Sequence, residues 1–172
     1  KDGRHPAMER LTLEEMVAHQ LALAGRRDRE RARAAPVCRG DRLFGKLAAT
    51  LPFALTAAQQ RVITEIRHDL AQPLPMLRLL QGDVGAGKTL VAAAAALTVL
   101  EAGRQVAVMA PTELLARQHL ASFGQWLAAL DMPVDWLAGS STAKQKRATL
   151  ERLASGAARL VIGTHALFQD GV

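Results

Sequence analysis

Eight consecutive residues, Gly82 to Thr89, have the types and spacing needed to hold the phosphates of a nucleotide. They fit the pattern G-x-x-x-x-G-K-[ST]. Glycines let backbone N–H groups approach phosphate oxygens, and a helix that follows adds unpaired donors and the positive end of a dipole. Lys88 would reach the β and γ phosphates, and Thr89 would place its hydroxyl on Mg²⁺. The motif predicts a nucleotide–Mg²⁺ site in which Lys88 and Thr89 are the candidate catalytic residues, formed by Gly82, Asp83, Val84, Gly85, Ala86, Gly87, Lys88 and Thr89.

The residues around this motif predict the strand and the helix that must position it. Met76 to Gln81 are expected to form a short buried strand, and Leu90 to Leu100 an alanine-rich helix. A strand, a glycine loop and a helix in that order favour nucleotide binding over the alternative, an ordinary glycine turn ahead of a helix. Elsewhere the apolar pattern predicts helices at 56–70, 88–102, 111–130 and 142–156, and strands at 105–110, 134–138 and 158–162. Strands that alternate with helices indicate an α/β fold with a parallel sheet and flanking helices.

The first 50 residues have a different pattern, which predicts a helical connector ahead of the α/β part. Thr12 and Glu15 have the spacing of a capping box, so a helix is expected to begin there. Residues 36–40 indicate a linker, and residues 43–51 a short helix or a loop. The predicted division is therefore a connector over residues 1–50 and a nucleotide-binding domain over residues 51–172.

The composition excludes several classes of protein. With 172 residues, 49% of them hydrophobic, the chain is long and apolar enough for one globular domain with an appendage. The single cysteine, Cys38, excludes an intramolecular disulfide, and no apolar run is long enough to span a membrane. The formal charge of +6 is compatible with a polyanionic partner, while 3% aromatic residues argue against base stacking as the way of binding nucleic acid. No signal peptide is present, which predicts a cytoplasmic protein.

Four further segments carry polar residues near the ends of predicted elements. They are Phe53-Ala54-Leu55-Thr56 with Gln59, Ala110–His119, Gly139-Ser140 and Gly163–Gln169. This set, in this order, resembles the first motor domain of superfamily 2 helicases, and more narrowly that of the RecG family, bacterial ATP-dependent helicases that remodel branched DNA. The resemblance covers residues 51–172 well and residues 1–47 more loosely. It implies a RecA-like P-loop fold, ATP and Mg²⁺ as cofactors, branched double-stranded DNA as a partner held by its backbone, and a second motor domain in the intact chain.

Within this resemblance Gln59 corresponds to the glutamine that recognises adenine, which would select ATP over GTP. A side-chain amide suits that role because it can both donate to and accept from the edge of a base. The same spacing, Thr56-x-x-Gln59, is also that of an ordinary helix capping box, and spacing does not separate the two uses. Phe53 would pack beside the base or in the core. Phe53, Thr56 and Gln59 are therefore the candidate contacts on the base side of the nucleotide.

The resemblance also implies that three strand ends hold the DNA backbone. The candidate contacts are Pro111, Thr112, Gly139, Ser140, Thr164 and His165. Helix N-termini and hydroxyls are good phosphate ligands, and ligands of open α/β sheets bind outside the carboxyl ends of the strands. The alternatives are a Pro-Thr helix start without a ligand and a structural histidine. Nearby cations are expected to be mostly solvated charges, namely Arg117, Lys144, Lys146 and Arg147.

One segment that the resemblance calls for is absent from the 172 residues. Superfamily 2 motors need an acidic D-E-x-H or D-E-A-D segment, whose aspartate orders Mg²⁺ and whose glutamate activates the attacking water. The family places it shortly beyond Gly163–Gln169, so we expect the chain to be the N-terminal part of the motor domain and to be unable to hydrolyse ATP by itself. Two other functions stay open on the sequence: the motor of a transcription-repair coupling factor-like translocase, and a non-catalytic nucleotide-binding module.

Overall fold

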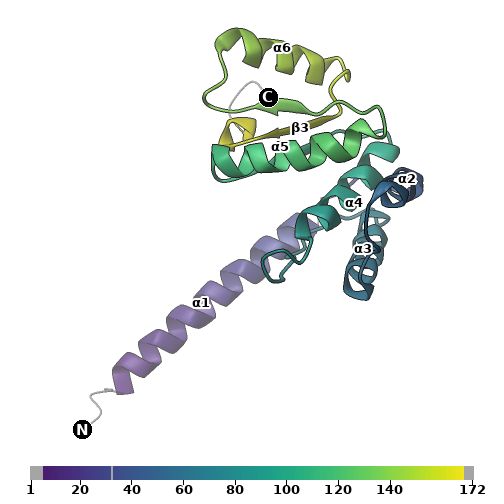
Figure 1. Ribbon diagram of the computed structural model, residues 1–172. Helices are drawn as coiled ribbons and strands as arrows, with labels where there is room; N and C mark the ends of the chain where they lie inside the picture. The colour runs from purple at the N-terminus through teal and green to yellow at the C-terminus, as the bar shows by residue number, and fades with distance from the viewer. Residues whose placement is uncertain (1–5, 32, 169–172) are drawn as a thin grey trace.

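The computed structural model describes residues 6–31 and 33–168, and within them strands and helices alternate from the phosphate loop onward. Their order along the chain is α1 (Pro6–Arg31), α2 (Arg42–Thr50), α3 (Ala57–Leu70), α4 (Lys88–Glu101), β1 (Val106–Met109), α5 (Glu113–Ala128), β2 (Asp135–Leu137), α6 (Ala143–Ala154), β3 (Leu160–Gly163) and a short 3-10 helix, η1 (His165–Phe168). Figure 1 shows β3 between α5 and α6, with α2, α3 and α4 gathered close together below and to the right of α5.

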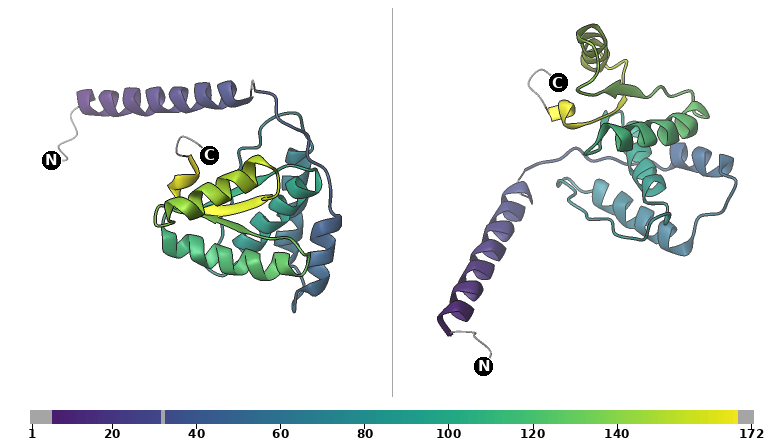
Figure 2. Two further views of the ribbon diagram at one scale, coloured as in Figure 1. Left: turned by 90° about the horizontal axis from the view of Figure 1, so that it is seen from above. Right: turned by 60° about the vertical axis from the view of Figure 1, so that its left-hand side comes forward.

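The first helix, α1, stands apart from the other elements, as the two views of Figure 2 also show. Its apolar side chains at Met8, Leu11 and Leu21 are at least 60% exposed. The prediction that the helix begins at Thr12 is wrong, because α1 begins at Pro6. Thr12 lies inside the helix, where its hydroxyl donates to the carbonyl of Met8 at 2.9 Å. This is the ordinary alternative use of a helical threonine, since its hydroxyl can bond to the carbonyl one turn earlier.

The second helix, α2, packs in the main core although it lies within the predicted connector. Leu47 is fully buried and Phe44 is 5% exposed, and both belong to the core cluster that includes the apolar face of α4. Glu101, at the end of α4, accepts the backbone N–H of Leu43 at 3.0 Å, and its carboxylate lies 3.4 Å from Arg42 Nε. The division at residue 50 stays a prediction, and these contacts fasten α2 to the helix that follows the phosphate loop.

The three strands form a parallel sheet in the order β1-β3-β2, which confirms the predicted α/β fold. Side chains of β3 alternate between the two faces of the sheet, as the pleat requires. Leu160 and Ile162 join the core formed with α4 and α5, whereas Val161 packs with Leu137 and the partly buried apolar side of α6. Every residue of the middle strand, β3, is buried, so packing on both faces of the sheet fixes the point at which the following segment begins.

The segment before the phosphate loop differs from its prediction. Residues 76–81 form no strand, and Leu77 and Leu79 are 80% and 81% exposed. Arg78 points to α3 instead, with its NH1 2.7 Å from Glu65 and its NH2 2.7 Å from Asp69. The pKa of Arg78 is raised, first by the hydrogen bond to Asp69. An apolar run becomes a strand only where a neighbouring strand pairs with it, and none of the described strands lies beside this one.

Candidate functional site

The phosphate loop turns directly into α4, as its sequence predicts. Gly85 and Gly87 have φ angles of +82° and +79°, a region that favours glycine. A Cβ at Gly87 would also overlap the side-chain amide of Gln59, whereas a Cβ at Gly85 would meet no other atom within 4 Å. Glycine at position 87 is therefore favoured by its backbone angle, and a side chain there would also displace the Gln59 amide.

The start of α4 presents a group of unpaired donors. In the described part of the chain, no backbone carbonyl accepts the N–H groups of Gly85, Gly87, Lys88 and Thr89. Lys88 extends across the loop, where its Nζ donates to the carbonyl of Gly82 at 2.6 Å and to that of Asp83 at 2.7 Å. An ammonium group has three N–H donors, so one remains for a ligand. Free N–H groups, a helix N-terminus and a lysine fit a chain of phosphates, since all three attract anions.

Gln59 connects the phosphate loop to α3, and it also completes the capping box of that helix. Its Oε1 accepts the N–H of Thr56 at 2.9 Å, and the Thr56 hydroxyl accepts the N–H of Gln59 at 3.2 Å. Its Nε2 donates to the carbonyl of Ala86 at 3.0 Å. The capping box predicted from the sequence is confirmed. The contact with Ala86 was not predicted, because nothing local in the sequence relates residues 59 and 86.

The other candidate residues on the nucleotide side are exposed. Phe53 is 53% exposed, so it belongs neither to the buried core nor to its partly buried rim. The loop residues Asp83 and Val84 are exposed, Val84 completely. The amide of Gln59 keeps one N–H and one oxygen lone pair beyond the bonds described, so the capping box leaves room for a base contact.

The three predicted DNA-contacting segments meet at one edge of the sheet. The N–H of Ala110, after β1, donates to the carbonyl of Gly163 at 2.9 Å, and the N–H of Thr164, after β3, donates to the carbonyl of Leu137 at 3.3 Å. Thr112 is the N-cap of α5, and its hydroxyl accepts the N–H of Leu115 at 3.3 Å. A hydroxyl that accepts still has its proton to donate, so the capping role of Thr112 leaves a donor for a phosphate.

The remaining candidates at this edge differ in accessibility. Pro111, Gly139, Ser140 and His165 are exposed, whereas Thr164 is only 6% exposed. His165 is the first residue of η1. Gln169, the last residue of the Gly163–Gln169 segment, lies outside the described residues. The structure therefore brings the three segments together, and Thr164 is buried whereas the other candidates in this paragraph are exposed.

Two charged residues at the same edge had no assigned role. Glu113 lies 2.7 Å from Arg117, and the Arg117 guanidinium carbon lies 5.1 Å from the centre of the Trp136 ring. The pKa of Glu113 is lowered, first by a hydrogen bond from the Ser140 side chain and then by Arg117. Arg117 was expected to be a mostly solvated charge, and its side chain is 61% exposed although it also contacts both neighbours. The i, i+4 spacing of Glu113 and Arg117 was the only sequence signal for this pair.

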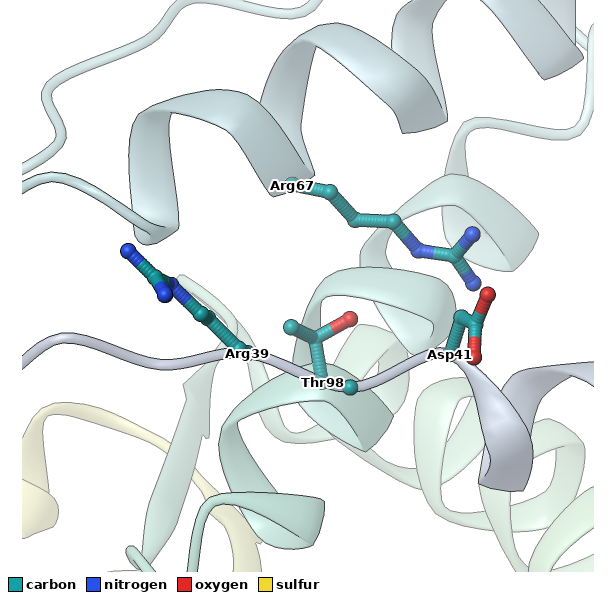
Figure 3. Close-up of a pocket in the computed structure, with 5 residues that line it drawn as sticks. Arg39, Asp41, Arg67 and Thr98 are labelled. Atoms are coloured by element: carbon teal, nitrogen blue, oxygen red, sulfur yellow. The ribbon is translucent and has the colours of Figure 1, made fainter.

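A cavity of about 270 Å³ lies at the far end of α4 from the phosphate loop (Figure 3). Arg39, Asp41, Arg67 and Thr98 line it, and Figure 3 shows the side chains of Arg67 and Asp41 pointing toward one another. Arg67 stacks over Phe44 at 5.3 Å, and its Nε has no hydrogen-bond partner among the described residues. No residue predicted for the nucleotide or DNA sites lines this cavity.

The comparison with known families decides among the nucleotide-binding folds. Residues 56–172 match the DEAD/DEAH box helicase family. The chain belongs to that family. Among curated relatives, the ATP-dependent DNA helicase RecG of Escherichia coli (strain K12) is 53% identical over 171 residues, which cover 99% of this chain and 25% of the relative. RecG of Haemophilus influenzae is 49% identical over 173 residues, covering 100% and 25%. The chain thus spans about a quarter of the length of these relatives.

Solved structures give the same family and fold. A RecG bound to a three-way DNA junction superimposes with a TM-score of 0.84 and 41% identity, over 94% of this chain and 22% of that one. A hypothetical ATP-dependent RNA helicase from Sulfolobus tokodaii superimposes with a TM-score of 0.52 over 75% of this chain and 35% of that one. At 21% identity it supports the fold alone. The RecA-like helicase fold and the RecG resemblance are confirmed. No helix in the described ranges has the length and apolar character needed to cross a membrane.

Proposed function

We propose that the intact protein is an ATP-dependent helicase that remodels branched DNA, and that this chain forms the nucleotide-binding part of its first motor domain. The observation that carries the proposal is the group of free N–H donors with Lys88 at the start of α4. The strand ends that meet at one edge of the sheet add a second surface suited to phosphates. The similarity to RecG along nearly the whole chain supports both assignments.

On the nucleotide side, each residue has a distinct task. The loop N–H groups and the remaining N–H of Lys88 bind the phosphates, and the Thr89 hydroxyl holds Mg²⁺. When bound, Mg²⁺ neutralises charge on the β and γ phosphates. The free N–H and lone pair of Gln59 recognise adenine, with Phe53 beside the base. The 172 residues contain no Asp-Glu pair, so no residue among them is assigned to activate the attacking water.

On the DNA side, backbone contacts would hold the duplex without reading its sequence. Pro111 and Thr112 start α5, whose N-terminus attracts a phosphate, and the Thr112 hydroxyl has a proton to donate. Gly139 and Ser140 lie at the end of β2, and His165 follows β3. Contacts of this type fix position and carry no base information, which suits an enzyme that acts on DNA shape.

The test is ATP hydrolysis by the full-length protein with and without synthetic three-way DNA junctions. Wild-type protein should hydrolyse ATP faster with the junction than with linear duplex. Lys88→Ala should lose about 100-fold in rate, because one preorganised cation is removed from the phosphates. Lys46→Ala, which changes an exposed lysine on α2, is the matched control and should behave as wild type. The proposal would be contradicted if wild-type protein hydrolysed ATP at the same rate with and without DNA, or if Lys88→Ala hydrolysed ATP as fast as wild type.

A further inference from the structure

The segment that enters the phosphate loop, residues 74–81, is placed by its side chains and not by its backbone. In the described part of the chain, no backbone–backbone hydrogen bond joins these residues to a neighbouring segment. Met76 and Leu80 pack against the main core, whereas the residues on either side of Arg78 are 80% and 81% exposed. Arg78 lies midway between the two packed residues, so the contacts of its side chain help to decide where the phosphate loop begins.

Two carboxylates, one turn apart on α3, hold the side chain of Arg78. Its Nε donates to Asp69 at 2.8 Å, its NH2 lies 2.7 Å from the same carboxylate, and its NH1 donates to Glu65 at 2.7 Å. The three side chains are between 32% and 44% exposed, so the contact is partly shielded from water. A guanidinium that bonds to two carboxylates through several N–H groups is held more firmly than one in a single exposed ion pair.

The same helix also contacts the far end of the phosphate loop. Gln59, in the first turn of α3, donates to the carbonyl of Ala86 at 3.0 Å, just before α4 begins. Arg78 lies four residues before Gly82, the first residue of the loop. Helix α3 therefore contacts the chain on both sides of the loop. A shift of the incoming segment would move the first residues of the loop relative to α4.

We propose that Arg78 is a positioning residue for nucleotide binding, which fixes the entry of the phosphate loop against α3 through Asp69 and Glu65. Arg78 does not touch the nucleotide in this role. It acts through the loop, by keeping in place the Gly82 carbonyl, which accepts from Lys88 at 2.6 Å, and the residues that follow. The role rests on the proposed function, because it concerns how that function's phosphate site is assembled. The alternative is an ion pair that only stabilises the fold, without effect on the nucleotide.

The experiment measures the affinity of the full-length protein for ATP by calorimetric titration, at a temperature where circular dichroism shows that every variant is folded. Arg78→Ala should weaken ATP binding by about threefold to fivefold, because a loop released from α3 spends part of its time out of place. Arg78→Met keeps an apolar side chain of similar reach without the charge, and should lose as much. Binding to a three-way DNA junction in the absence of nucleotide should not change.

Changing the partner separates positioning from a simple effect of charge. Asp69→Ala removes a negative charge, which by itself would strengthen the binding of an anion such as ATP. If Asp69 helps to position the loop, the same change should weaken ATP binding, so the two explanations predict opposite signs. The double variant Arg78→Ala/Asp69→Ala should bind ATP no more weakly than Arg78→Ala alone, because both changes break the same contact.

Arg61→Ala is the matched control, since it removes an exposed arginine that lies 3.8 Å from Glu65 on the same helix. It should leave the affinity for ATP unchanged. The positioning role would be overturned by wild-type affinity in Arg78→Ala or Arg78→Met, tighter binding in Asp69→Ala, additive losses in the double variant, or an equal loss in Arg61→Ala. Wild-type protein that fails to bind ATP would instead contradict the proposed function itself, and with it this role.

Discussion

Replacing Gln59 by alanine tests whether the phosphate loop is held in place from α3. The side chain makes two hydrogen bonds, one to the N–H of Thr56 at 2.9 Å and one to the carbonyl of Ala86 at 3.0 Å. Only the second bond touches the loop. A hydrogen bond of this kind contributes about 1 kcal/mol, or about fivefold in an equilibrium constant. We therefore expect Gln59→Ala to weaken the binding of any nucleoside triphosphate by about that factor.

The assay compares ATP with GTP, by calorimetric titration of the full-length protein. Loss of the bond to Ala86 affects both nucleotides alike, because it changes the loop that holds the phosphates. Loss of adenine recognition affects ATP alone. The fall in GTP affinity therefore measures the loop effect, and any additional fall in ATP affinity measures the contact with the base.

A second capping box in the same chain provides a matched control. Gln145 accepts the N–H of Thr142 at 2.9 Å and caps α6 in the way that Gln59 caps α3, and no contact joins it to the phosphate loop. Gln145→Ala should lose the same helix cap and leave both nucleotide affinities unchanged. An unchanged GTP affinity in Gln59→Ala, or an equal loss in Gln145→Ala, would show that the bond to Ala86 does not hold the loop.

Three other predictions concern the core, the sheet and the strand ends. Leu47→Ala, at a fully buried position on α2, should lower the free energy of unfolding of the nucleotide-binding domain by about 2–5 kcal/mol in urea titrations, and the same titration of Lys46→Ala should show no loss. An unshifted midpoint for Leu47→Ala would mean that α2 is not part of that core. Gly163→Ala should destabilise the protein by about 3 kcal/mol, because its Cβ would overlap the carbonyl of Leu137 in the neighbouring strand. Thermal melting should show little change for Gly139→Ala, where a Cβ meets nothing within 4 Å. The pKa of the Glu113 carboxyl is lowered first by Ser140 and then by Arg117. Its contribution to the free energy of unfolding should be complete at pH values above the ordinary glutamate pKa, and should be lost as the pH falls through the lowered pKa. Carboxyl-carbon NMR should find this low midpoint and a rise in Ser140→Ala, and an unmoved midpoint would argue against the hydrogen bond.

Features fixed by residues close together in the sequence were predicted well. The phosphate loop before α4 and the capping box of α3 depend on a few adjacent positions, and both are found. The parallel sheet followed from the alternation of strands and helices. The same local reasoning failed at Thr12, because a threonine followed by a glutamate three residues later also occurs inside helices, as it does in α1.

Features that depend on distant partners were not predictable in this way. Residues 76–81 have an apolar composition typical of a buried strand, but none of the described strands pairs with them, and Arg78 turns toward two acids of α3. The stacking of Arg117 over Trp136 and the bond from Gln59 to Ala86 each join segments that only the fold brings together. Both lie in segments that the sequence had singled out as candidate sites, but the contacts themselves are found only in the structure.

The contacts of α4 bear on where the nucleotide-binding unit begins. Just before α4 begins, Gln59 of α3 donates to the carbonyl of Ala86 in the loop. At the last residue of α4, Glu101 accepts the N–H of Leu43 near the start of α2. The chain before α2 is also docked, since the N–H of Cys38 donates to the carbonyl of Leu70 at 2.8 Å and Cys38 itself is 4% exposed. Both ends of α4 are therefore held by segments that precede it in the sequence. A boundary at residue 50 would cut through one packed unit, whereas a boundary before Cys38 would leave every one of these contacts intact.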